Sequence, residues 1–223
     1  MRLLDSRIQR SVDRDIFWRA REFFLEEGAL KRSEHGLRVG SRDGYYFDID
    51  YLLNDPIKCQ LISDIYIKLI RNLARKKRID LLAFIEKASG GTIGVLRLAG
   101  NISIATKIPN AVIRPKKDIF FERVKIPFFA RGEMGIKRGL GGLSAVIVTD
   151  HCTTGREALI AQDILCTLGA EVSNVISYTV RSDKFSKDEY NKRGVTLTSA
   201  YSLPPSNEMP KSLLEIGSIA VNY

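Results

Sequence analysis

Cysteine and long apolar runs are scarce in this sequence, and each absence excludes a class of protein. The three cysteines, Cys59, Cys152 and Cys166, are odd in number and form no CxxC pair, so neither a disulfide framework nor a zinc site is indicated. No apolar run approaches the ~18 residues of a membrane span. Met1 to Gly28 alternates charged and apolar residues too often for a signal-peptide core. We therefore expect a cytoplasmic protein without membrane association.

The composition is that of one globular domain with an excess of positive charge. The 223 residues are 44% hydrophobic, which allows an ordinary core, and 35 Lys and Arg against 26 Asp and Glu give a net charge of +9. This charge favours anionic partners, either phosphorylated metabolites or nucleic acid. No nucleic-acid recognition motif accompanies it. The basic run Arg71 to Arg78 is interpreted as the solvated end of a helix, where cations complement the helix dipole.

Residue patterns predict an N-terminal cap followed by an α/β sheet. The cap comprises an amphipathic helix that ends at Gly28 and an aromatic strand at Gly44 to Asp50, and a longer helix begins at Pro56. Further strands are expected at Leu81–Ile85, Ala111–Ile113, Ala145–Val148 and Val172–Val180. Glycine turns and helical stretches separate these runs, which is typical of an open, mostly parallel sheet with flanking helices. We expect one domain over residues 1–223, with residues 1–50 contributing the N-terminal helix and cap.

The segment from Val146 to Gly155 combines an apolar strand, an acidic residue and a Thr-Thr-Gly turn before a helix. Such a turn directs backbone N–H groups and two hydroxyls to one point, where the helix dipole adds positive potential. This arrangement fits a phosphate monoester. Asp150, at the strand end, can accept hydrogen bonds from ribose hydroxyls directly or through a metal. The alternative is an ordinary turn capped by threonine.

Val146 to Arg156 resembles the phosphoribosyl-pyrophosphate signature of the type I phosphoribosyltransferases, and the orotate branch fits best. Further segments resemble that branch in the same order: Arg38 to Asp48, Asp55-Pro56, Gly90-Gly91, Arg114 to Lys117, Arg181 and Gly194 to Leu203. The resemblance implies a Mg²⁺-dependent transferase that makes a pyrimidine nucleotide from phosphoribosyl pyrophosphate and a base, with orotate as the leading candidate. It also implies a homodimer, because the family's mobile loop reaches into a neighbouring subunit's site.

The resemblance assigns a role to each matching residue. The 5-phosphate would bind at the turn and the helix start, which comprise Thr153, Thr154, Gly155, Arg156 and Glu157. Asp150 would hold the ribose hydroxyls and Mg²⁺. Pyrophosphate would meet the backbone of Ser89, Gly90 and Gly91 and the cations Arg114, Lys116 and Lys117. Orotate would contact Arg38, Arg181, Tyr46 and Phe47. The candidate catalytic residues are Asp150, Lys116 and Lys117.

Several of these residues have a purely structural alternative. Tyr46 and Phe47 also fit strand packing, Arg181 a surface charge, Lys116 and Lys117 a solvated pair, and Gly90-Gly91 a plain turn. His151 has no partner spacing that indicates a ligand or a triad. Cys152 is expected near a helix N-terminus, which can lower the pKa of a thiol, but no other residue supports a nucleophile.

Two positions near the turn depart from the family pattern. Thr149 occupies the first acidic position of the signature, which leaves one carboxylate where two are usual, and Glu157 stands where a small hydroxyl residue is common. The Lys-x-His-Gly of the mobile loop has no counterpart. These differences define an alternative function, a non-catalytic regulatory protein that binds nucleotide or phosphoribosyl pyrophosphate. The sequence leaves open whether the chain is an enzyme.

Overall fold

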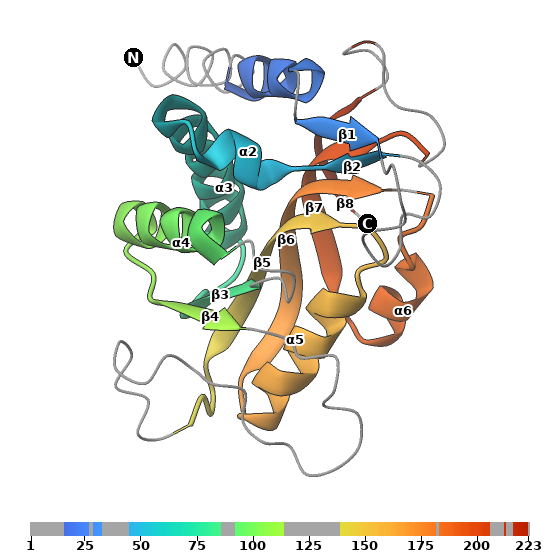
Figure 1. Ribbon diagram of the computed structural model, residues 1–223. Helices are drawn as coiled ribbons and strands as arrows, with labels where there is room; N and C mark the ends of the chain where they lie inside the picture. Colours follow the sequence, from blue (N-terminus) through green and yellow to red (C-terminus); the bar gives the residue numbers. More distant parts are fainter. Residues whose placement is uncertain are drawn as a thin grey trace, which may run out of the picture.

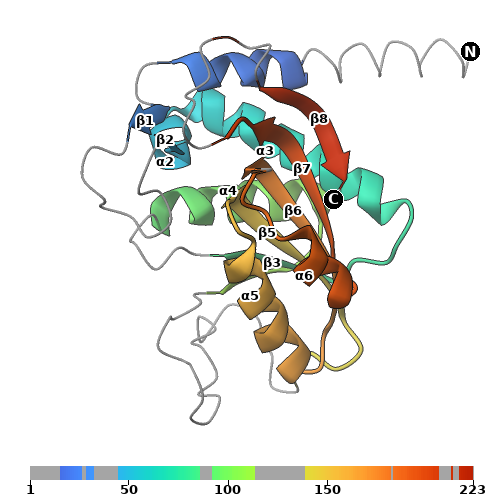
Figure 2. The same cartoon turned by 90° about the vertical axis from the view of Figure 1, so that its right-hand side faces the viewer.

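A six-stranded sheet with helices on both faces forms the centre of the computed structural model, which describes residues 16–26, 29–32, 45–85, 92–113, 139–181, 183–205, 212 and 216–222 (Figures 1 and 2). The strands are β3 (Leu81–Ile85), β4 (Asn110–Ile113), β5 (Ser144–Cys152), β6 (Glu171–Arg181), β7 (Thr196–Leu203) and β8 (Gly217–Asn222). Their order is β4-β3-β5-β6-β7-β8; β3 to β7 run parallel, and β8 pairs antiparallel with β7. The expected open, mostly parallel sheet is confirmed.

Helices cover the two faces of this sheet. One face carries α2 (Ile49–Leu53), α3 (Pro56–Ala74), α4 (Thr92–Thr106), a helix at residues 16–22, the 3-10 helix η1 (Phe23–Leu25) and the hairpin of β1 (Leu30–Arg32) and β2 (Tyr45–Phe47). The other face carries α5 (Arg156–Thr167) and α6 (Lys187–Lys192). Because both faces are covered, every residue of β3 is buried, and the strands are continuous apolar runs. Within the described residues, every helix is too short or too polar to span a bilayer.

Aromatic side chains attach the N-terminal elements to the sheet. The ring of Phe24 lies 5.9 Å from that of Tyr178 on β6 and 5.1 Å from that of Tyr201 on β7. The Tyr201 hydroxyl also donates a 2.6 Å hydrogen bond to the carbonyl of Phe17. The described N-terminal residues thus pack on the sheet, whereas the extent of the domain and the role of the whole segment 1–50 stay predictions.

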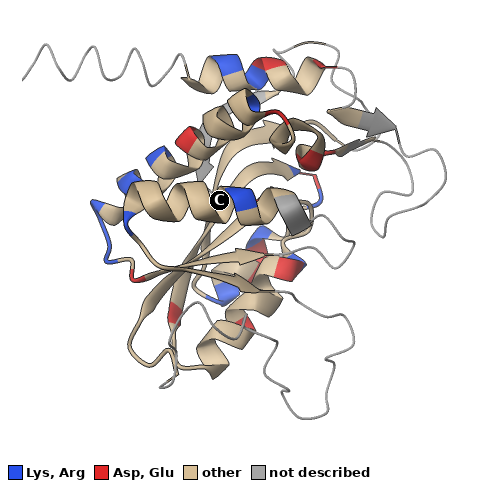
Figure 3. Cartoon of the chain, turned by 60° about the vertical axis from the view of Figure 1, so that its left-hand side comes forward, with Lys and Arg blue, Asp and Glu red and all other residues tan. Residues whose placement is uncertain are grey.

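The helix α3 ends in the basic run that is prominent in the sequence. Figure 3 shows Lys and Arg positions gathered at this end of the helix. The Lys and Arg side chains from residue 75 to residue 78 are exposed, and Arg78 forms an ion pair with Asp80 at 2.7 Å. The Nζ atom of Lys77 donates a hydrogen bond to the side chain of Asn174 at 3.2 Å. The interpretation of this run as a solvated helix end is confirmed.

The chain reverses its direction across the sheet between β3 and β5. From β3 it passes through α4 to β4 on one side, and from β5 it passes through α5 to β6 on the other side. Because α4 and α5 lie on opposite faces of the sheet, the connections that leave β3 and β5 diverge. Open α/β sheets bind ligands in the crevice beyond the strand ends at such a point.

Candidate functional site

The segments singled out in the sequence follow the carboxyl ends of neighbouring parallel strands. β3 ends at Ile85 and β4 at Ile113, and these two residues are register partners. β5 continues further, since Val148 pairs with Phe84 and Asp150 comes two residues later. The residues predicted to meet pyrophosphate directly follow β3 and β4 in the sequence and lie outside the described residues: Ser89, Gly90, Gly91, Arg114, Lys116 and Lys117.

The Thr-Thr-Gly turn connects β5 to α5, as predicted. We call residues Thr153 to Gly155 the phosphate turn. Gly155 has φ 81° and ψ −2° and precedes the first helical residue, and only glycine adopts this left-handed conformation at no steric cost. The N–H of Arg156 donates a 3.4 Å hydrogen bond to the hydroxyl of Thr154. The first N–H groups of a helix have no partner within the helix, so this end of α5 presents donors and a positive potential.

Asp150 lies near the end of β5, and His151 and Cys152 separate it from the phosphate turn. It is 6% exposed, and its Oδ1 accepts a 2.6 Å hydrogen bond from the N–H of His151 and a 3.5 Å bond from the hydroxyl of Thr149. It lines a small pocket together with Tyr66 of α3. The buried Tyr66 hydroxyl donates to the carbonyl of Thr149 at 2.7 Å, which fixes the strand end that carries the carboxylate. Burial and the nearby charge of Asp150 raise the pKa of Tyr66, so the hydroxyl remains a donor.

Arg181 is the last residue of β6 and is held beneath the N-terminal hairpin. Its side chain is 2% exposed, so the alternative of a surface charge is wrong. Its Nη2 donates a 2.5 Å hydrogen bond to the carbonyl of Tyr45, and its guanidinium carbon lies 4.6 Å from the centre of the Tyr45 ring. Among the described residues, its Nε has no hydrogen-bond partner. Cys152 pairs with Val180 in the sheet, so the backbone of Arg181 at the end of β6 lies near the start of the phosphate turn.

The other predicted base-binding residues are placed only in part. Phe47 is 4% exposed, and its ring lies 4.8 Å from Phe24 and 5.8 Å from Tyr178, which are the contacts of a core residue. Tyr46 belongs to β2, but its side chain lies outside the described residues, as does Arg38. A role for these three residues in base binding stays a prediction.

Several curated proteins of similar sequence are named orotate phosphoribosyltransferase. A scan against models of protein families finds no match. The orotate phosphoribosyltransferase of Pyrococcus furiosus is 28% identical over 173 residues, which are 78% of this chain and 85% of that protein. The orotate phosphoribosyltransferase of Methanopyrus kandleri is 26% identical over 181 residues, 81% of this chain and 86% of that protein. The chain is therefore similar in sequence to orotate phosphoribosyltransferases, which supports the resemblance to the orotate branch of the type I phosphoribosyltransferases.

Solved structures of phosphoribosyltransferases share the fold. The orotate phosphoribosyltransferase of Aeropyrum pernix superposes with a TM-score of 0.63 at 21% identity, and the match covers 82% of this chain and 93% of that one. An adenine phosphoribosyltransferase reaches a TM-score of 0.57 at 17% identity over 81% of this chain and 98% of that one. At these identities the similarity shows the phosphoribosyltransferase fold.

Phosphoribosyltransferase chemistry implies Mg²⁺, and the residues at the strand ends can be tested for it. No three His, Cys, Asp or Glu side chains of the described ranges gather where they could hold a metal ion. Asp150 is the one carboxylate in strand β5, and its neighbour Thr149 supplies only a hydroxyl. Mg²⁺ is often held by one or two carboxylates, waters and substrate phosphates. The donor set therefore fits a Mg²⁺ ion that is held largely by the substrate.

Cys152 and Glu157 lie on either side of the phosphate turn in the sequence. Cys152 is 3% exposed, and burial raises the pKa of its thiol to about 12, so the possible lowering by the helix N-terminus is outweighed. A thiol protonated at neutral pH is a poor nucleophile. Glu157 is exposed in the first turn of α5, where its charge complements the helix dipole.

The structure adds residues that the sequence did not indicate. Tyr190 of α6 donates a 3.0 Å hydrogen bond to the carbonyl of Gly155, and Tyr66 supports Thr149. These partners are 35 and 83 residues apart, and no local pattern reports such distant pairs. The Nδ1 atom of His151 lies 2.6 Å from the hydroxyl of Thr179, its register partner on β6, a contact between neighbouring strands.

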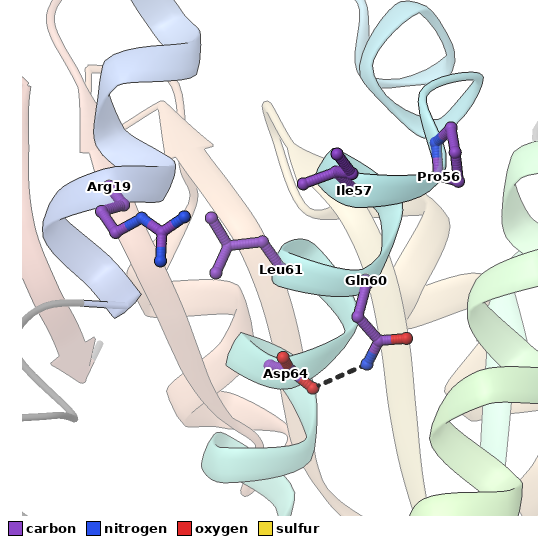
Figure 4. A pocket seen from close by; sticks show the side chains of 6 residues that line it. All are labelled: Arg19, Pro56, Ile57, Gln60, Leu61 and Asp64. Carbon is purple, nitrogen blue, oxygen red and sulfur yellow. Dashed lines mark hydrogen bonds between the residues drawn. The ribbon is translucent and has the colours of Figure 1, made fainter.

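An open groove of about 370 Å³ lies elsewhere, between the helix at residues 16–22 and α3 (Figure 4). Its lining is Arg19, Pro56, Ile57, Gln60, Leu61 and Asp64. In it the Gln60 amide donates a 2.9 Å hydrogen bond to the Asp64 carboxylate. None of the site residues predicted from the sequence lines this groove, so it is separate from the site at the strand ends.

Proposed function

We propose that this chain transfers phosphoribose from phosphoribosyl pyrophosphate to a base, and that the base is orotate. The observation that carries the proposal is the phosphate turn shortly after Asp150, at the point where the chain reverses across the sheet. Its relatives in sequence are named orotate phosphoribosyltransferases, which supports the choice of base. The product would be a pyrimidine nucleotide.

The phosphate turn would bind the 5-phosphate. The donors in this proposal are the hydroxyls and backbone N–H groups of Thr153 and Thr154 and the N–H groups of Gly155, Arg156 and Glu157. Gly155 lets the backbone approach the ligand closely, and the dipole of α5 favours its negative charge. The net charge of +9 would attract the polyanionic substrate from solution.

Asp150 would orient the ribose by accepting hydrogen bonds from its hydroxyls. Bound Mg²⁺, with Asp150 as its protein ligand, would supply charge neutralisation at the pyrophosphate. In the reaction the bond from the anomeric carbon to pyrophosphate breaks, a bond to a ring nitrogen of the base forms, and the proton of that nitrogen is released to solvent. Backbone N–H groups of Ser89, Gly90 and Gly91 and the cations Arg114, Lys116 and Lys117 would stabilise the leaving group. Lys116 and Lys117, with Asp150, are the proposed catalytic residues.

Arg181 and Arg38 would bind the carboxylate and carbonyl oxygens of orotate. A guanidinium has five N–H donors, and the bond to the Tyr45 carbonyl uses one of those of Arg181. Tyr46 and Phe47 would contact the ring. An acidic base suits such a site, because a neutral purine would leave two arginines without a charged partner.

We also propose that the chain acts as a homodimer. Among the described residues, the exposed large hydrophobic side chains all lie on elements of the face that carries α3 and α4: Trp18, Leu25, Tyr51, Ile57, Leu96 and Ile104. A second copy on this face would remove them from water. Light scattering should give twice the mass of one chain. A monomeric wild-type chain would contradict the dimer, and Ile57→Glu with Ile104→Glu should convert the dimer to monomers.

The activity is tested by incubating the chain with phosphoribosyl pyrophosphate, Mg²⁺ and orotate, and measuring released pyrophosphate and nucleotide product. We expect turnover with orotate and much less with adenine. Absence of turnover together with thermal stabilisation by nucleotide would instead support the alternative function, a regulatory protein that binds these ligands. Thr149, in place of a second carboxylate, is the observation that favours that alternative.

A further inference from the structure

We infer that Tyr190 is a positioning residue for the phosphate turn: its hydroxyl fixes the Gly155 carbonyl, and the N–H groups that receive the 5-phosphate are oriented as a result. The inference rests on the proposed function of the turn. Tyr190 lies on α6, beside α5 (Figures 1 and 2), and is fully buried.

The Gly155 carbonyl accepts two hydrogen bonds. One comes from the N–H of Leu159 at 3.2 Å, which is the first bond of α5, and the other from the Tyr190 hydroxyl at 3.0 Å. A carbonyl oxygen has two lone pairs, so both are used. The helix alone would leave this first peptide free to tilt, as helix ends do, and the second bond restrains it.

The orientation of the Gly155 carbonyl determines where the next N–H points. A trans peptide is planar, and its C=O and N–H groups point in opposite directions. The N–H of Arg156 therefore points away from Tyr190 and toward the ligand side of the turn, where it reaches the Thr154 hydroxyl at 3.4 Å. The Thr154 carbonyl is held from the same side, by the N–H of Ser186 at 3.5 Å. The carbonyls of Thr154 and Gly155 thus face the α6 side. The N–H groups of the same two peptides, those of Gly155 and Arg156, face the opposite side.

The ring of Tyr190 closes the back of the turn. A Cβ atom on Gly155 would lie 2.5 Å from Cε2 of Tyr190, 2.8 Å from its hydroxyl and 3.0 Å from Cε2 of Phe185. The rings of Phe185 and Tyr190 are 4.6 Å apart in an edge-to-face arrangement, which fixes the tyrosine ring. A leucine at position 190 could fill the same space, but it would lack the hydroxyl that donates to the Gly155 carbonyl.

Cys152 connects the same hydroxyl to the end of β5. Its Sγ lies 3.9 Å from the Tyr190 oxygen, and burial raises the pKa of both groups, so both stay protonated. The Tyr190 proton is used by the Gly155 carbonyl, so the thiol donates to the phenol oxygen. The hydroxyl therefore joins the residue before the phosphate turn to the last residue of the turn.

The test is Tyr190→Phe, which removes the hydroxyl and keeps the ring. Titration calorimetry with ribose 5-phosphate should show binding weaker by about three- to tenfold, the range that one hydrogen bond covers. In turnover, KM for phosphoribosyl pyrophosphate should rise by a similar factor, while kcat and KM for orotate stay unchanged, because the lost contact is shared by ground and transition states. A merely destabilised protein would show a lower active fraction with normal affinity.

Tyr201→Phe is the matched control, since it removes a buried hydroxyl that donates to a backbone carbonyl on the opposite face of the sheet. We expect it to lower stability without changing the affinity for ribose 5-phosphate. Equal affinity of wild type and Tyr190→Phe would overturn the inference and leave the proposed function standing. No binding of ribose 5-phosphate by the wild type would overturn both.

A second variant covers the case in which Tyr190→Phe does not fold. Phe185→Leu keeps the hydroxyl but loosens the ring that holds it in place. Weaker binding of ribose 5-phosphate, with an unchanged circular dichroism spectrum, supports the positioning role. Unchanged binding by this variant overturns it.

Discussion

At the scale of single residues, most of the proposed chemistry falls on Asp150. The side chain is nearly buried, and one of its oxygens is already bonded to the N–H of His151. With Thr149 beside it in place of a second acid, no other carboxylate in β5 can take over its contacts with ribose. The proposed chemistry therefore depends on a single carboxylate, whereas the family signature provides two.

Asp150→Asn should lower kcat/KM for phosphoribosyl transfer by on the order of 10²-fold, because an amide cannot replace the charge that holds the ribose hydroxyls and Mg²⁺. Steady-state kinetics measure the change. Asp163→Asn, at an exposed position on α5 whose carboxylate forms an ion pair with Arg193, is the control and should have little effect on the rate. A rate for Asp150→Asn within twofold of wild type would contradict the assigned role.

The three cysteines should differ sharply in reactivity. Cys166 is exposed, whereas Cys59 and Cys152 are buried and burial raises the pKa of both thiols. Titration with a disulfide reagent at neutral pH should modify one thiol rapidly and the other two only after unfolding. Cys166→Ser should abolish the rapid phase. A rapid phase of two thiols in the folded wild type would show that the surroundings of Cys152 are open.

At the scale of elements, the start of α3 illustrates a local signal that predicts structure. The Asp55 carboxylate accepts hydrogen bonds from the N–H groups of Ile57 and Lys58 at 2.8 and 3.1 Å, and Pro56 occupies the first turn. Both features lie within four residues of sequence. A helix start at this point was therefore predictable.

Asp55→Ala should lower the free energy of unfolding by about 1 kcal/mol, the usual cost of losing an N-terminal cap. Urea denaturation followed by circular dichroism measures this change. Asp55→Asn keeps an oxygen acceptor and should lose less than half as much. If the alanine variant were as stable as wild type, the cap would not contribute to the stability of α3.

The central strands were also predictable, whereas the edge strand β8 and the burial of Arg181 were not. Continuous apolar runs located β3 to β6, because strands covered on both faces need apolar residues throughout. The antiparallel pairing of β8 with β7 has no such signal, since β8 lies at the edge of the sheet. The burial of Arg181 depends on β2, which contributes the Tyr45 carbonyl from 136 residues away. Contacts between distant segments are fixed by packing, which local patterns do not report.

At the scale of the whole molecule, buried acidic hydroxyls and thiols make the fold sensitive to alkali. Burial raises the pKa of Cys152 from 9.0 to about 12, and it raises the pKa of Tyr66, Tyr178, Tyr190 and Tyr201 above their ordinary value of 10.0. At high pH the unfolded chain loses these protons while the folded chain keeps them. The unfolded state then binds fewer protons, so stability falls as pH rises.

The free energy of unfolding should therefore be steady up to about pH 8.5 and fall above pH 9, with a loss from Cys152 alone on the order of 1 kcal/mol at pH 10. Denaturant titrations at pH 8 and pH 10 measure the fall. Cys152→Ala should show a smaller difference between the two values, whatever its absolute stability. Equal stability of the wild type at both values would contradict the burial of these groups.

The residues of the candidate site were easier to predict from the sequence than the contacts that support them. Asp150 and the phosphate turn lie within one short segment of the chain, so a motif could locate them. Tyr66 of α3 and Tyr190 of α6 donate hydrogen bonds to this segment from separate elements, and only the structure identifies these contacts. A phosphate site can therefore be predicted from a short segment, but the contacts that hold it rigid cannot.

The most direct test of the account is a crystal structure of the chain with ribose 5-phosphate. We predict the phosphate at the start of α5, within hydrogen-bond distance of the N–H groups of Gly155 and Arg156, with ribose hydroxyls on the carboxylate of Asp150. Phosphate bound at another place, or the Glu157 carboxylate turned into the phosphate turn, would contradict the account.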